Sequence, residues 1–282
     1  MVIEKAYAKV NLFLNVLDKR EDGYHSLEML NTKIDLFDIL TFKIIDSEEA
    51  IIIKSNDLFL SNQENIVIQV ARYMMKRYDI KSGLEITIEK NIPFGAGLAG
   101  NSADSAAVIK GMNKLFSLNL SLDKMMDIAV NFGADIPYCL VDKPAFVSGI
   151  GEKIEEVDLD LSNYKLLLIN PKEFIGTKDV FEIGDKSGFK TYNIENIKHL
   201  LMNNQFDIFK KHLHNSLEEV VINNYPFMKE FKEILIEKLN SEGLVMTGSG
   251  STFIKLTEKS TDLSQFIEEF KDRYFVKTYN FL

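Results

Sequence analysis

Several things common in proteins are scarce in this 282-residue chain. It has a single cysteine, Cys139, so it cannot form an internal disulfide framework, and one thiol suits a reducing compartment such as the cytoplasm. Its longest apolar runs, such as residues 166–169, are far too short to span a membrane, and its first residues are not expected to act as a signal sequence. Its 33 basic residues are outnumbered by 42 acidic ones, which argues against nucleic acid as a partner. The composition leaves a monomer and a homodimer both open.

The sequence is organised around residues 93–107, which read PFGAGLAGNSADSAA. Apolar and polar residues alternate over 84–89, which predicts a half-buried strand before this stretch. Apolar residues at helical spacing predict a helix over 102–116 after it. A glycine-rich loop that opens a helix directs backbone N–H groups and the positive end of the helix dipole at one point. The stretch therefore predicts an anion site, most often one for phosphate.

Two better-known patterns share residues with this loop. Gly95, Gly97 and Gly100 have the spacing of a dinucleotide fingerprint, which would indicate an NAD(H)-dependent oxidoreductase, but the expected next strand with its acidic residue is replaced by another helix. Gly95 and Gly100 also have Walker A spacing, but Asn101 stands where the phosphate-binding lysine must be. A plain connection without a ligand would not need three glycines before a run of small residues.

Three further residues are candidates for a catalytic or binding role. A strand predicted over residues 6–17 places Lys9 and Asn11 on one face, because alternate residues of a strand point the same way. Lys9 lies either on a solvated face or in a functional site. Asp135 follows a predicted helix that Gly133 is expected to end as its C′ residue. Asp135 is either a cap or turn residue or a functional acid paired with a cation.

A predicted turn at Asp22-Gly23 is followed by Tyr24 and His25. An adjacent aromatic ring and imidazole can stack on, and hydrogen-bond to, a flat ligand such as a nucleobase. The alternative is a packed tyrosine beside a surface histidine.

The remaining periodicities predict an α+β fold. A charged stretch over residues 152–160 is the expected boundary between domains of residues 1–158 and 159–282. In the second domain, some predicted strands are separated by helices and others follow one another directly. This order is typical of a split βαβ arrangement, which is therefore expected there. Strands are predicted near 38–45, 50–54, 165–169, 244–246, 253–256 and 274–281, an edge hairpin at 149–151, an exposed loop at 185–193, and helices near 64–78, 177–181, 194–203, 205–222, 226–240 and 262–272.

Three blocks of the sequence together resemble the motifs of the GHMP kinase superfamily. They are AKVNL at residues 8–12, the loop at 93–102 and TGSG at 247–250. Residues 8–16, 22–27 and 133–137 narrow the resemblance to the kinases that act on a cytidine diphosphate ester of methylerythritol, in the non-mevalonate (MEP) pathway to isoprenoid and terpenoid precursors. The resemblance implies a two-domain GHMP kinase fold. Its N-terminal domain is ribosomal-protein-S5-like and binds ATP, and its C-terminal domain is ferredoxin-like.

The resemblance also implies a reaction and roles for named residues. The γ-phosphoryl group of ATP, with Mg²⁺, would pass to the 2-hydroxyl of the small-molecule substrate. Asp135 would accept the hydroxyl proton, while Lys9 would keep Asp135 ionised and orient the nucleophile. The polar groups of the substrate are expected on Asn11 and Thr177, and its cytosine ring is expected between Tyr24 and Phe181 with its edge on His25.

By the same resemblance, two loops would hold the ATP phosphates, with Ser102 near Mg²⁺. Asn101 departs from the glycine usual in the family, and Asn31 stands where some members have an aromatic residue. Another GHMP kinase, of mevalonate or homoserine type, and a catalytically inactive nucleotide-binding relative remain alternatives. The residues assigned to ATP are Pro93, Phe94, Gly95, Ala96, Gly97, Leu98, Ala99, Gly100, Asn101, Ser102, Ala103, Gly248, Ser249 and Gly250.

Overall fold

The computed structural model describes residues 1–56 and 65–282. The chain divides into two compact units, each assembled from several stretches. The long strands β1 (Val2–Lys19) and β2 (His25–Ile45) continue from one unit into the other. The division into residues 1–158 and 159–282 stays a prediction. Unit 1 comprises Met1–Lys9, Leu36–Phe94 and Ala99–Asp142, and unit 2 comprises Val10–Asp35, Gly95–Leu98 and Lys143–Leu282.

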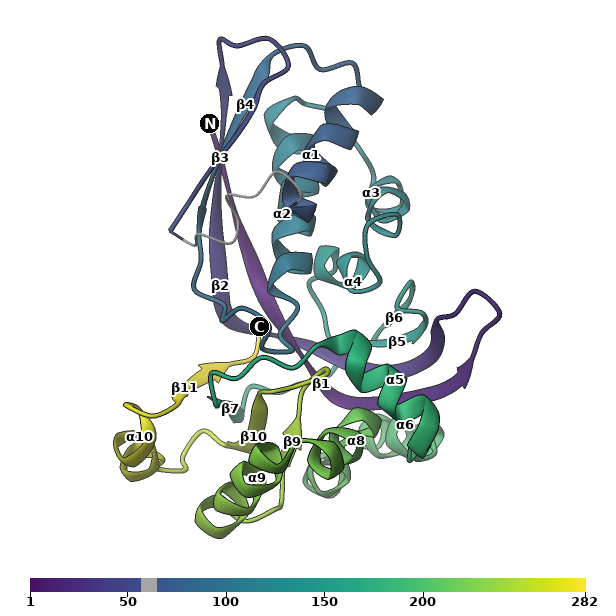
Figure 1. Ribbon diagram of the computed structural model, residues 1–282, viewed down its shortest axis with the longest axis vertical. Helices are drawn as coiled ribbons and strands as arrows, with labels where there is room; N and C mark the ends of the chain where they lie inside the picture. The colour runs from purple at the N-terminus through teal and green to yellow at the C-terminus, as the bar shows by residue number, and fades with distance from the viewer. Residues whose placement is uncertain (57–64) are drawn as a thin grey trace. The chain divides into compact units, whose positions relative to one another are not determined.

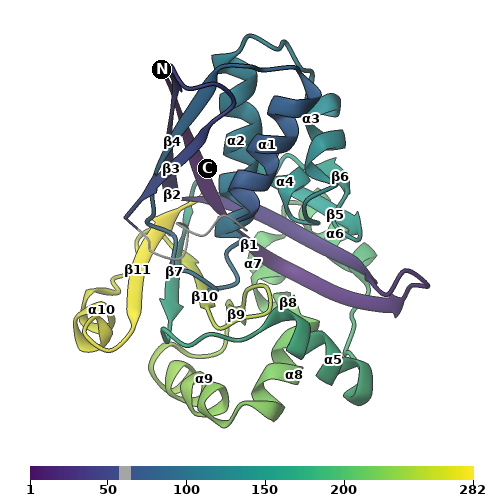
Figure 2. The same cartoon turned by 45° about the horizontal axis from the view of Figure 1, so that its top comes forward.

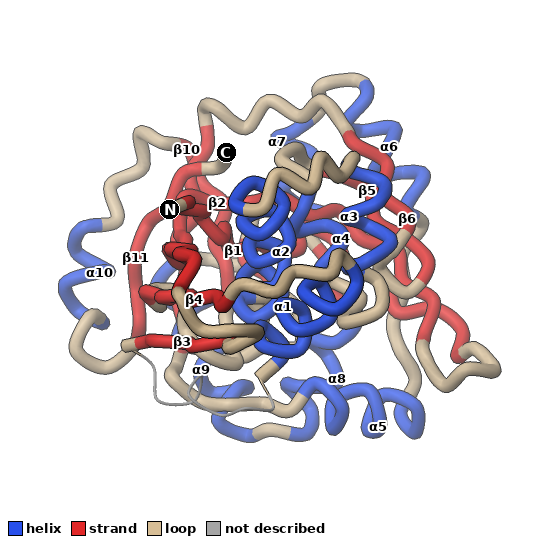
Figure 3. Tube along the Cα trace, turned by 90° about the horizontal axis from the view of Figure 1, so that it is seen from above, coloured by secondary structure: helices blue, strands red, loops and turns tan. Residues whose placement is uncertain are grey.

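Unit 1 is a sheet with helices on one face (Figures 1 and 3). Strand β4 (Gly83–Glu89) pairs with β3 (Ile51–Ser55) in parallel and with the end of β2 in antiparallel register. The helices are α1 (Ile66–Arg77), α2 (Gly100–Leu115), α3 (Leu122–Ala129) and α4 (Ile136–Leu140).

The core of unit 1 follows from the alternation in β4 and the apolar faces of α1 and α2. Leu84, Ile86 and Ile88 of β4 are buried, whereas Thr87 and Glu89 are exposed, which confirms the predicted half-buried strand. At Gly111, α2 passes so close to β2 that an added Cβ would lie 2.3 Å from the Phe42 ring. Only glycine fits at that contact.

Unit 2 contains a second, antiparallel sheet in the order β11-β7-β10-β9 (Figure 2). One of its two inner strands, β7 (Tyr164–Asn170), is buried over 166–169, in agreement with the prediction of a buried strand there. Its other strands are β9 (Leu244–Met246), β10 (Phe253–Glu258) and β11 (Phe275–Asn280).

The rest of unit 2 comprises short strands beside β1 and β2 and a set of helices. Strands β5 (Ala145–Gly149) and β6 (Lys153–Glu156) form the predicted edge hairpin, and β5 pairs with β2. The two-residue strand β8 (His214–Asn215) pairs with β1 in parallel. The helices are α5 (Thr177–Ser187), α6 (Ile194–Met202), α7 (Phe206–Phe209), α8 (Ser216–Asn224), α9 (Pro226–Leu239) and α10 (Ser264–Phe270).

Three expectations differ from the structure, and a fourth lies partly outside the described residues. The helix predicted over 205–222 is wrong as one helix, because His214 and Asn215 pair with β1 and divide it into α7, a 3₁₀ turn and α8. Gly133 does not end α3, which already stops at Ala129. The loop predicted from residue 185 begins only after Ser187, because α5 is longer than expected. Residue 64, in the predicted helix 64–78, lies outside the described residues.

No helix within residues 1–56 and 65–282 has both the length and the apolarity needed to cross a membrane.

Candidate active site

Lys9 and Asp135 form an ion pair in unit 1. The Lys9 Nζ lies 3.3 Å from the Asp135 Oδ1, and the two side chains are 4% and 39% exposed. Strand β1 places Lys9 on the same strand face as Asn11, since the two residues alternate along it. The arrangement joins a buried cation to a carboxylate that solvent or a ligand can reach.

The position of Asp135 at the start of α4 leaves its carboxylate available. Asp135 occupies the N-cap position of this helix, yet its side chain makes no capping hydrogen bond. Its backbone carbonyl accepts from the N–H of Cys139 at 3.2 Å. The side chain is therefore not used as a helix cap, which was the structural alternative for this residue.

The start of α2 has the features of an anion site. Ala99, its N-cap residue, has φ 55° in the left-handed region, and no side chain caps the helix. The first-turn N–H groups are therefore not covered by a capping side chain. Ser102 is half-buried in this turn, and Asn101 is exposed, so the Asn101 side chain does not fill the space behind the loop.

In unit 2, residues 95–98 of the central loop pack against the second small-residue loop. Gly97, at φ 71°, approaches so closely that an added Cβ would lie 2.3 Å from the carbonyl oxygen of Thr247. An added Cβ on Gly248 would in turn lie 2.8 Å from the carbonyl oxygen of Gly97. Both glycines are required by this mutual backbone contact. The structure thus brings together two loops that lie about 150 residues apart in the sequence.

Two asparagines, through backbone and side-chain groups, hold the second loop in place. The Asn11 N–H donates to the Thr247 hydroxyl at 3.0 Å, and the Asn11 Oδ1 accepts from the Gly248 N–H at 3.1 Å. The Asn215 Nδ2 donates to the carbonyl oxygens of Met246 and Gly248, both at 2.7 Å. Asn11 is thus built into the loop that the sequence assigns to ATP.

Thr177 is the first residue of α5, and its hydroxyl lies 2.8 Å from the Ser249 hydroxyl. The structure therefore connects a residue predicted to bind the acceptor substrate with one predicted to bind ATP. Either hydroxyl can be the donor of this hydrogen bond.

Two of the residues predicted to bind the cytosine ring, His25 and Phe181, are in contact with each other. His25 is buried and stacks on Phe181, with ring centroids 5.1 Å apart and an interplanar angle of 27°. The Phe189 ring meets His25 edge-on at 5.5 Å. Tyr24, in contrast, is 59% exposed.

Asp185 orients the imidazole and was missed by sequence reasoning. The His25 Nε2 lies 2.6 Å from the Asp185 Oδ1. The Lys19 Nζ is 2.5 Å from the other oxygen of Asp185 and lowers the pKa of that carboxyl below its usual range, to which His25 also contributes. Because the Asp185 carboxylate can only accept, the Nε2–H of His25 donates this hydrogen bond, and in that tautomer the Nδ1 is an acceptor. No spacing signal links residues 25 and 185.

Asn215 and Asn31 were also absent from the predicted site roles. Asn215 has a local signal, since it caps α8 by accepting from the Leu217 N–H at 2.9 Å, but that signal marks only a helix start. The Asn31 Oδ1 accepts from the Asn11 Nδ2 at 2.6 Å. Asn31 thus helps to fix the amide orientation of Asn11, a role that an aromatic side chain cannot fill.

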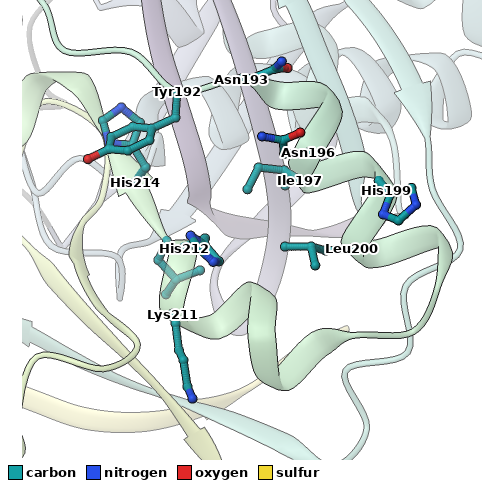
Figure 4. A pocket seen from close by; sticks show the side chains of 10 residues that line it. Tyr192, Asn193, Asn196, Ile197, His199, Leu200, Lys211, His212 and His214 are labelled. Carbon is teal, nitrogen blue, oxygen red and sulfur yellow. The ribbon is translucent and has the colours of Figure 1, made fainter.

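A separate cavity of about 460 Å³ lies in unit 2 beside α6 (Figure 4). Burial lowers the pKa of His214 at its rim to about 4, so this imidazole is neutral at pH 7. The Tyr192 ring lies against His214, with centroids 4.5 Å apart. None of the residues lining the cavity was predicted to act on ATP or on the acceptor; they are Tyr192, Asn193, Asn196, Ile197, His199, Leu200, Lys211, His212, Leu213 and His214.

Within the part of the chain that the structure describes, no three histidine, cysteine or carboxylate side chains gather as a metal cluster. This does not conflict with a kinase, because Mg²⁺ in such enzymes is held largely by substrate phosphates, with few protein ligands. The half-buried Ser102 beside the uncapped turn of α2 fits that mode of binding.

Two family models each match one continuous stretch of the chain. The model of the GHMP kinases N terminal domain matches residues 65–149, and the model of the GHMP kinases C terminal domain matches residues 193–276. Among solved structures, a crystal structure of 4-(cytidine 5'-diphospho)-2C-methyl-D-erythritol kinase superposes with a TM-score of 0.80 at 28% identity, covering 99% of each chain. A homoserine kinase from Cytophaga hutchinsonii shares the fold, with a TM-score of 0.72 at 17% identity, covering 99% of this chain and 94% of its own.

Curated relatives are more similar in sequence. The 4-diphosphocytidyl-2-C-methyl-D-erythritol kinase of Caldicellulosiruptor bescii is 40% identical over 87% of this chain and 86% of its own length. That of Alkaliphilus oremlandii is 38% identical over 98% of this chain and 96% of its own. These matches confirm the predicted two-domain α+β GHMP kinase fold. The chain therefore belongs to the GHMP kinase superfamily and, within it, to the family of 4-diphosphocytidyl-2-C-methyl-D-erythritol kinases.

Proposed function

We propose that this protein transfers the γ-phosphoryl group of ATP to the 2-hydroxyl of 4-diphosphocytidyl-2-C-methyl-D-erythritol, with ADP as the second product. The observation that carries the proposal is the pair of a buried Lys9 and an accessible Asp135. This pair lies in a chain 38–40% identical to kinases named for that substrate. Phosphoryl transfer mainly requires alignment of the reactants and stabilisation of negative charge, and both residues suit those tasks.

Asp135 acts as the proton acceptor for the substrate hydroxyl. Its carboxylate is free of the capping bond that its position would allow, and it is 39% exposed. As the hydroxyl oxygen attacks the γ-phosphorus, its proton passes to a carboxylate oxygen of Asp135. The bond between the γ-phosphorus and the bridging oxygen breaks, and ADP leaves with that oxygen.

Lys9 pairs with Asp135 and stabilises the negative charge of the transition state. Its ammonium lies 3.3 Å from the carboxylate, and its side chain is 4% exposed. Burial strengthens its field, because the surroundings screen the charge less than water does. The same ammonium holds the nucleophilic oxygen in line for attack.

The backbone at the start of α2 binds the ATP phosphates. The left-handed Ala99 and the absence of a side-chain cap leave the helix N-terminus available to an anion. Gly248, Ser249 and Gly250 contribute the second loop, which Gly97 contacts closely. Ser102 is the residue that would help to hold Mg²⁺, and the ion would supply neutralisation of charge on the transferred group.

The cytosine ring of the substrate is recognised by the His25 region. With its Nε2 bonded to Asp185, His25 offers Nδ1 as an acceptor for the 4-amino group of cytosine. Phe181 fixes the imidazole by stacking, and the exposed Tyr24 covers the base. Thr177 and Asn11 bind the polar groups of the remaining substrate. We place the protein in the cytoplasm, in keeping with its single thiol, as a monomer or homodimer with domains of residues 1–158 and 159–282.

The experiment is a measurement of ADP release by the purified protein with ATP and Mg²⁺. Four acceptors are offered separately: 4-diphosphocytidyl-2-C-methyl-D-erythritol, mevalonate, homoserine and galactose. Turnover confined to the cytidine compound supports the proposal. Turnover with another acceptor would retain the roles of Lys9 and Asp135 but refute the base pocket. Binding of ATP without turnover on any acceptor would favour a catalytically inactive relative.

A further inference from the structure

A buried cluster of three charges lies beneath the start of α2 in unit 1. The Lys90 Nζ donates to the Asp104 Oδ2 at 2.7 Å and to the Asp38 Oδ2. The Lys90 side chain is 8% exposed, and both carboxylates are fully buried. Lys90 directly follows β4, Asp38 lies on β2 and Asp104 lies on α2, so three elements meet at one ammonium group.

The two carboxylates are connected to the two ends of the central glycine loop. The Asp38 Oδ1 accepts from the N–H groups of Asn91, at 2.5 Å, and Ile92, at 2.8 Å, which are the last residues before Pro93. Asp104 lies one turn into α2, the helix that begins where the loop ends. The segment entering the loop is thus bound by Asp38 and the segment leaving it by Asp104.

We infer that Asp104 is a positioning residue for ATP: through Lys90 and Asp38 it ties both ends of the glycine loop together, so that the N–H groups of the first turn of α2 point at the phosphates. The inference rests on the proposed function, because it needs ATP at this loop. Fixing the ends of a loop in the bound geometry lowers the conformational entropy lost on ligand binding. Asp104 therefore favours ATP binding without touching the nucleotide.

An alternative role for this cluster is direct phosphate binding by Lys90. Lys90 lies close to the helix start, since its Nζ would be 3.5 Å from a Cβ added to Gly100. It would then replace the lysine that is missing at Asn101. The geometry opposes this role, because the ammonium is buried and already donates to two carboxylates. Its charge is balanced inside the protein before any phosphate arrives.

Asp104 is a poor residue for stability alone. The cluster contains one cation and two carboxylates, and the Asp104 Oδ1 has no hydrogen-bond partner among the described residues. A buried carboxylate oxygen without a partner costs stability. Replacement of Asp104 by alanine leaves Lys90 and Asp38 as a charge-balanced pair, so the fold should survive the change.

The same helix supplies a control at its other end. Lys114, in the last turn of α2, pairs with the buried Glu4 of β1 at 2.7 Å. This ion pair also ties α2 to the sheet strands, but far along the helix from the glycine loop. Glu4→Ala therefore removes a more exposed ion pair between the same helix and the sheet without altering the ends of the loop.

The test is the dissociation constant of MgATP, measured by calorimetric titration of the full chain. Wild type, Asp104→Ala, Asp104→Asn and Glu4→Ala are compared, with Asp104→Ser as a second truncated variant should alanine lower the folded yield. We expect Asp104→Ala to weaken binding about tenfold or more, as a displaced positioning group does. Asp104→Asn keeps an oxygen that accepts from Lys90, so it should stay within about threefold of wild type. Glu4→Ala should bind as wild type does.

Steady-state kinetics add a readout that a merely structural role would not move. In Asp104→Ala the KM for ATP should rise while the KM for the cytidine substrate stays unchanged. The inference is overturned if the truncated variants bind MgATP as wild type does, if Glu4→Ala weakens binding equally, or if both KM values rise together. A wild-type protein that does not bind MgATP would refute the proposed function itself, and this inference with it.

Discussion

Two lysine–aspartate sites in unit 1 use the same residue types in opposite settings. The Asp135 carboxylate is 39% exposed and lies 3.3 Å from Lys9. Asp38 and Asp104 are fully buried and share Lys90. A carboxylate that a ligand can reach is able to exchange a proton with it, whereas one that is enclosed can only hold other parts of the protein. Exposure of the acid therefore separates the proposed catalytic pair from the positioning cluster.

The largest expected effect is that of Asp135→Asn on turnover. The amide keeps the shape of the side chain but accepts no proton, so we expect kcat to fall by about 10³-fold, within the usual range for loss of a general base. Thermal unfolding should remain close to wild type. Asp142→Asn is the matched control, because Asp142 lies just beyond the other end of α4 and is exposed. Near-normal turnover in Asp135→Asn would end its catalytic assignment.

Lys90→Met should produce the largest change in stability. It leaves two buried carboxylates without their cation, which costs about 3–5 kcal/mol in the free energy of unfolding. Urea denaturation followed by circular dichroism measures this cost. Lys54→Met is the control, since Lys54 forms an exposed pair with Glu85 at 2.7 Å and should leave the urea midpoint nearly unchanged. Equal urea midpoints for the two variants would mean that the buried Lys90 contributes no more to stability than the exposed Lys54 does.

Lys9→Met should lower kcat by about 100-fold, as loss of a charge that stabilises the transition state does. The loss is smaller than that for Asp135 because the base is still present. Lys5→Met on the same strand is the control, since Lys5 is exposed and its ammonium lies 4.3 Å above the Phe37 ring. Equal rates for Lys9→Met and Lys5→Met would contradict a catalytic Lys9.

The smallest expected effect is on substrate binding. Tyr24→Ala should raise the KM for the cytidine substrate about tenfold, because stacking of one base on an aromatic ring contributes roughly 1–3 kcal/mol. The KM for ATP serves as the internal control and should not change. If both KM values rose equally, Tyr24 would not be a base-stacking residue.

Local patterns in the sequence predicted much of the fold. The alternation in β4, the periodicity of α2 and the Pro226 start of α9 each depend on neighbours in the chain, and each prediction agrees with the structure. The prediction of one helix over 205–222 failed because Asn215 makes tertiary contacts that a continuous helix would not allow. Its side chain holds the carbonyl oxygens of Met246 and Gly248, and its backbone pairs with β1. Tertiary contacts of this kind override helix propensity.

In the candidate site, too, features marked by local sequence were predicted and features that depend on tertiary contacts were not. Lys9, Asp135 and the two glycine loops carry motifs, so their residues were predicted, and the structure pairs Lys9 with Asp135 and the loops with each other. Asp185 and the Lys90 cluster were not predicted, because each depends on residues brought together by folding. Asp185 meets His25 across 160 positions of sequence. Only the three-dimensional structure reveals such partners.

The most direct test of the account is the ³¹P spectrum of the reaction product. The proposed acceptor oxygen lies on a tertiary carbon, so a phosphate placed there has no hydrogen three bonds away. We predict that incubation of the protein with ATP, Mg²⁺ and 4-diphosphocytidyl-2-C-methyl-D-erythritol yields one new phosphomonoester singlet, equal in amount to the ADP formed. A doublet or triplet would place the phosphate on another hydroxyl, and ADP without a phosphomonoester would mean that water is the acceptor. Either result would contradict the alignment of the 2-hydroxyl by Lys9 and Asp135.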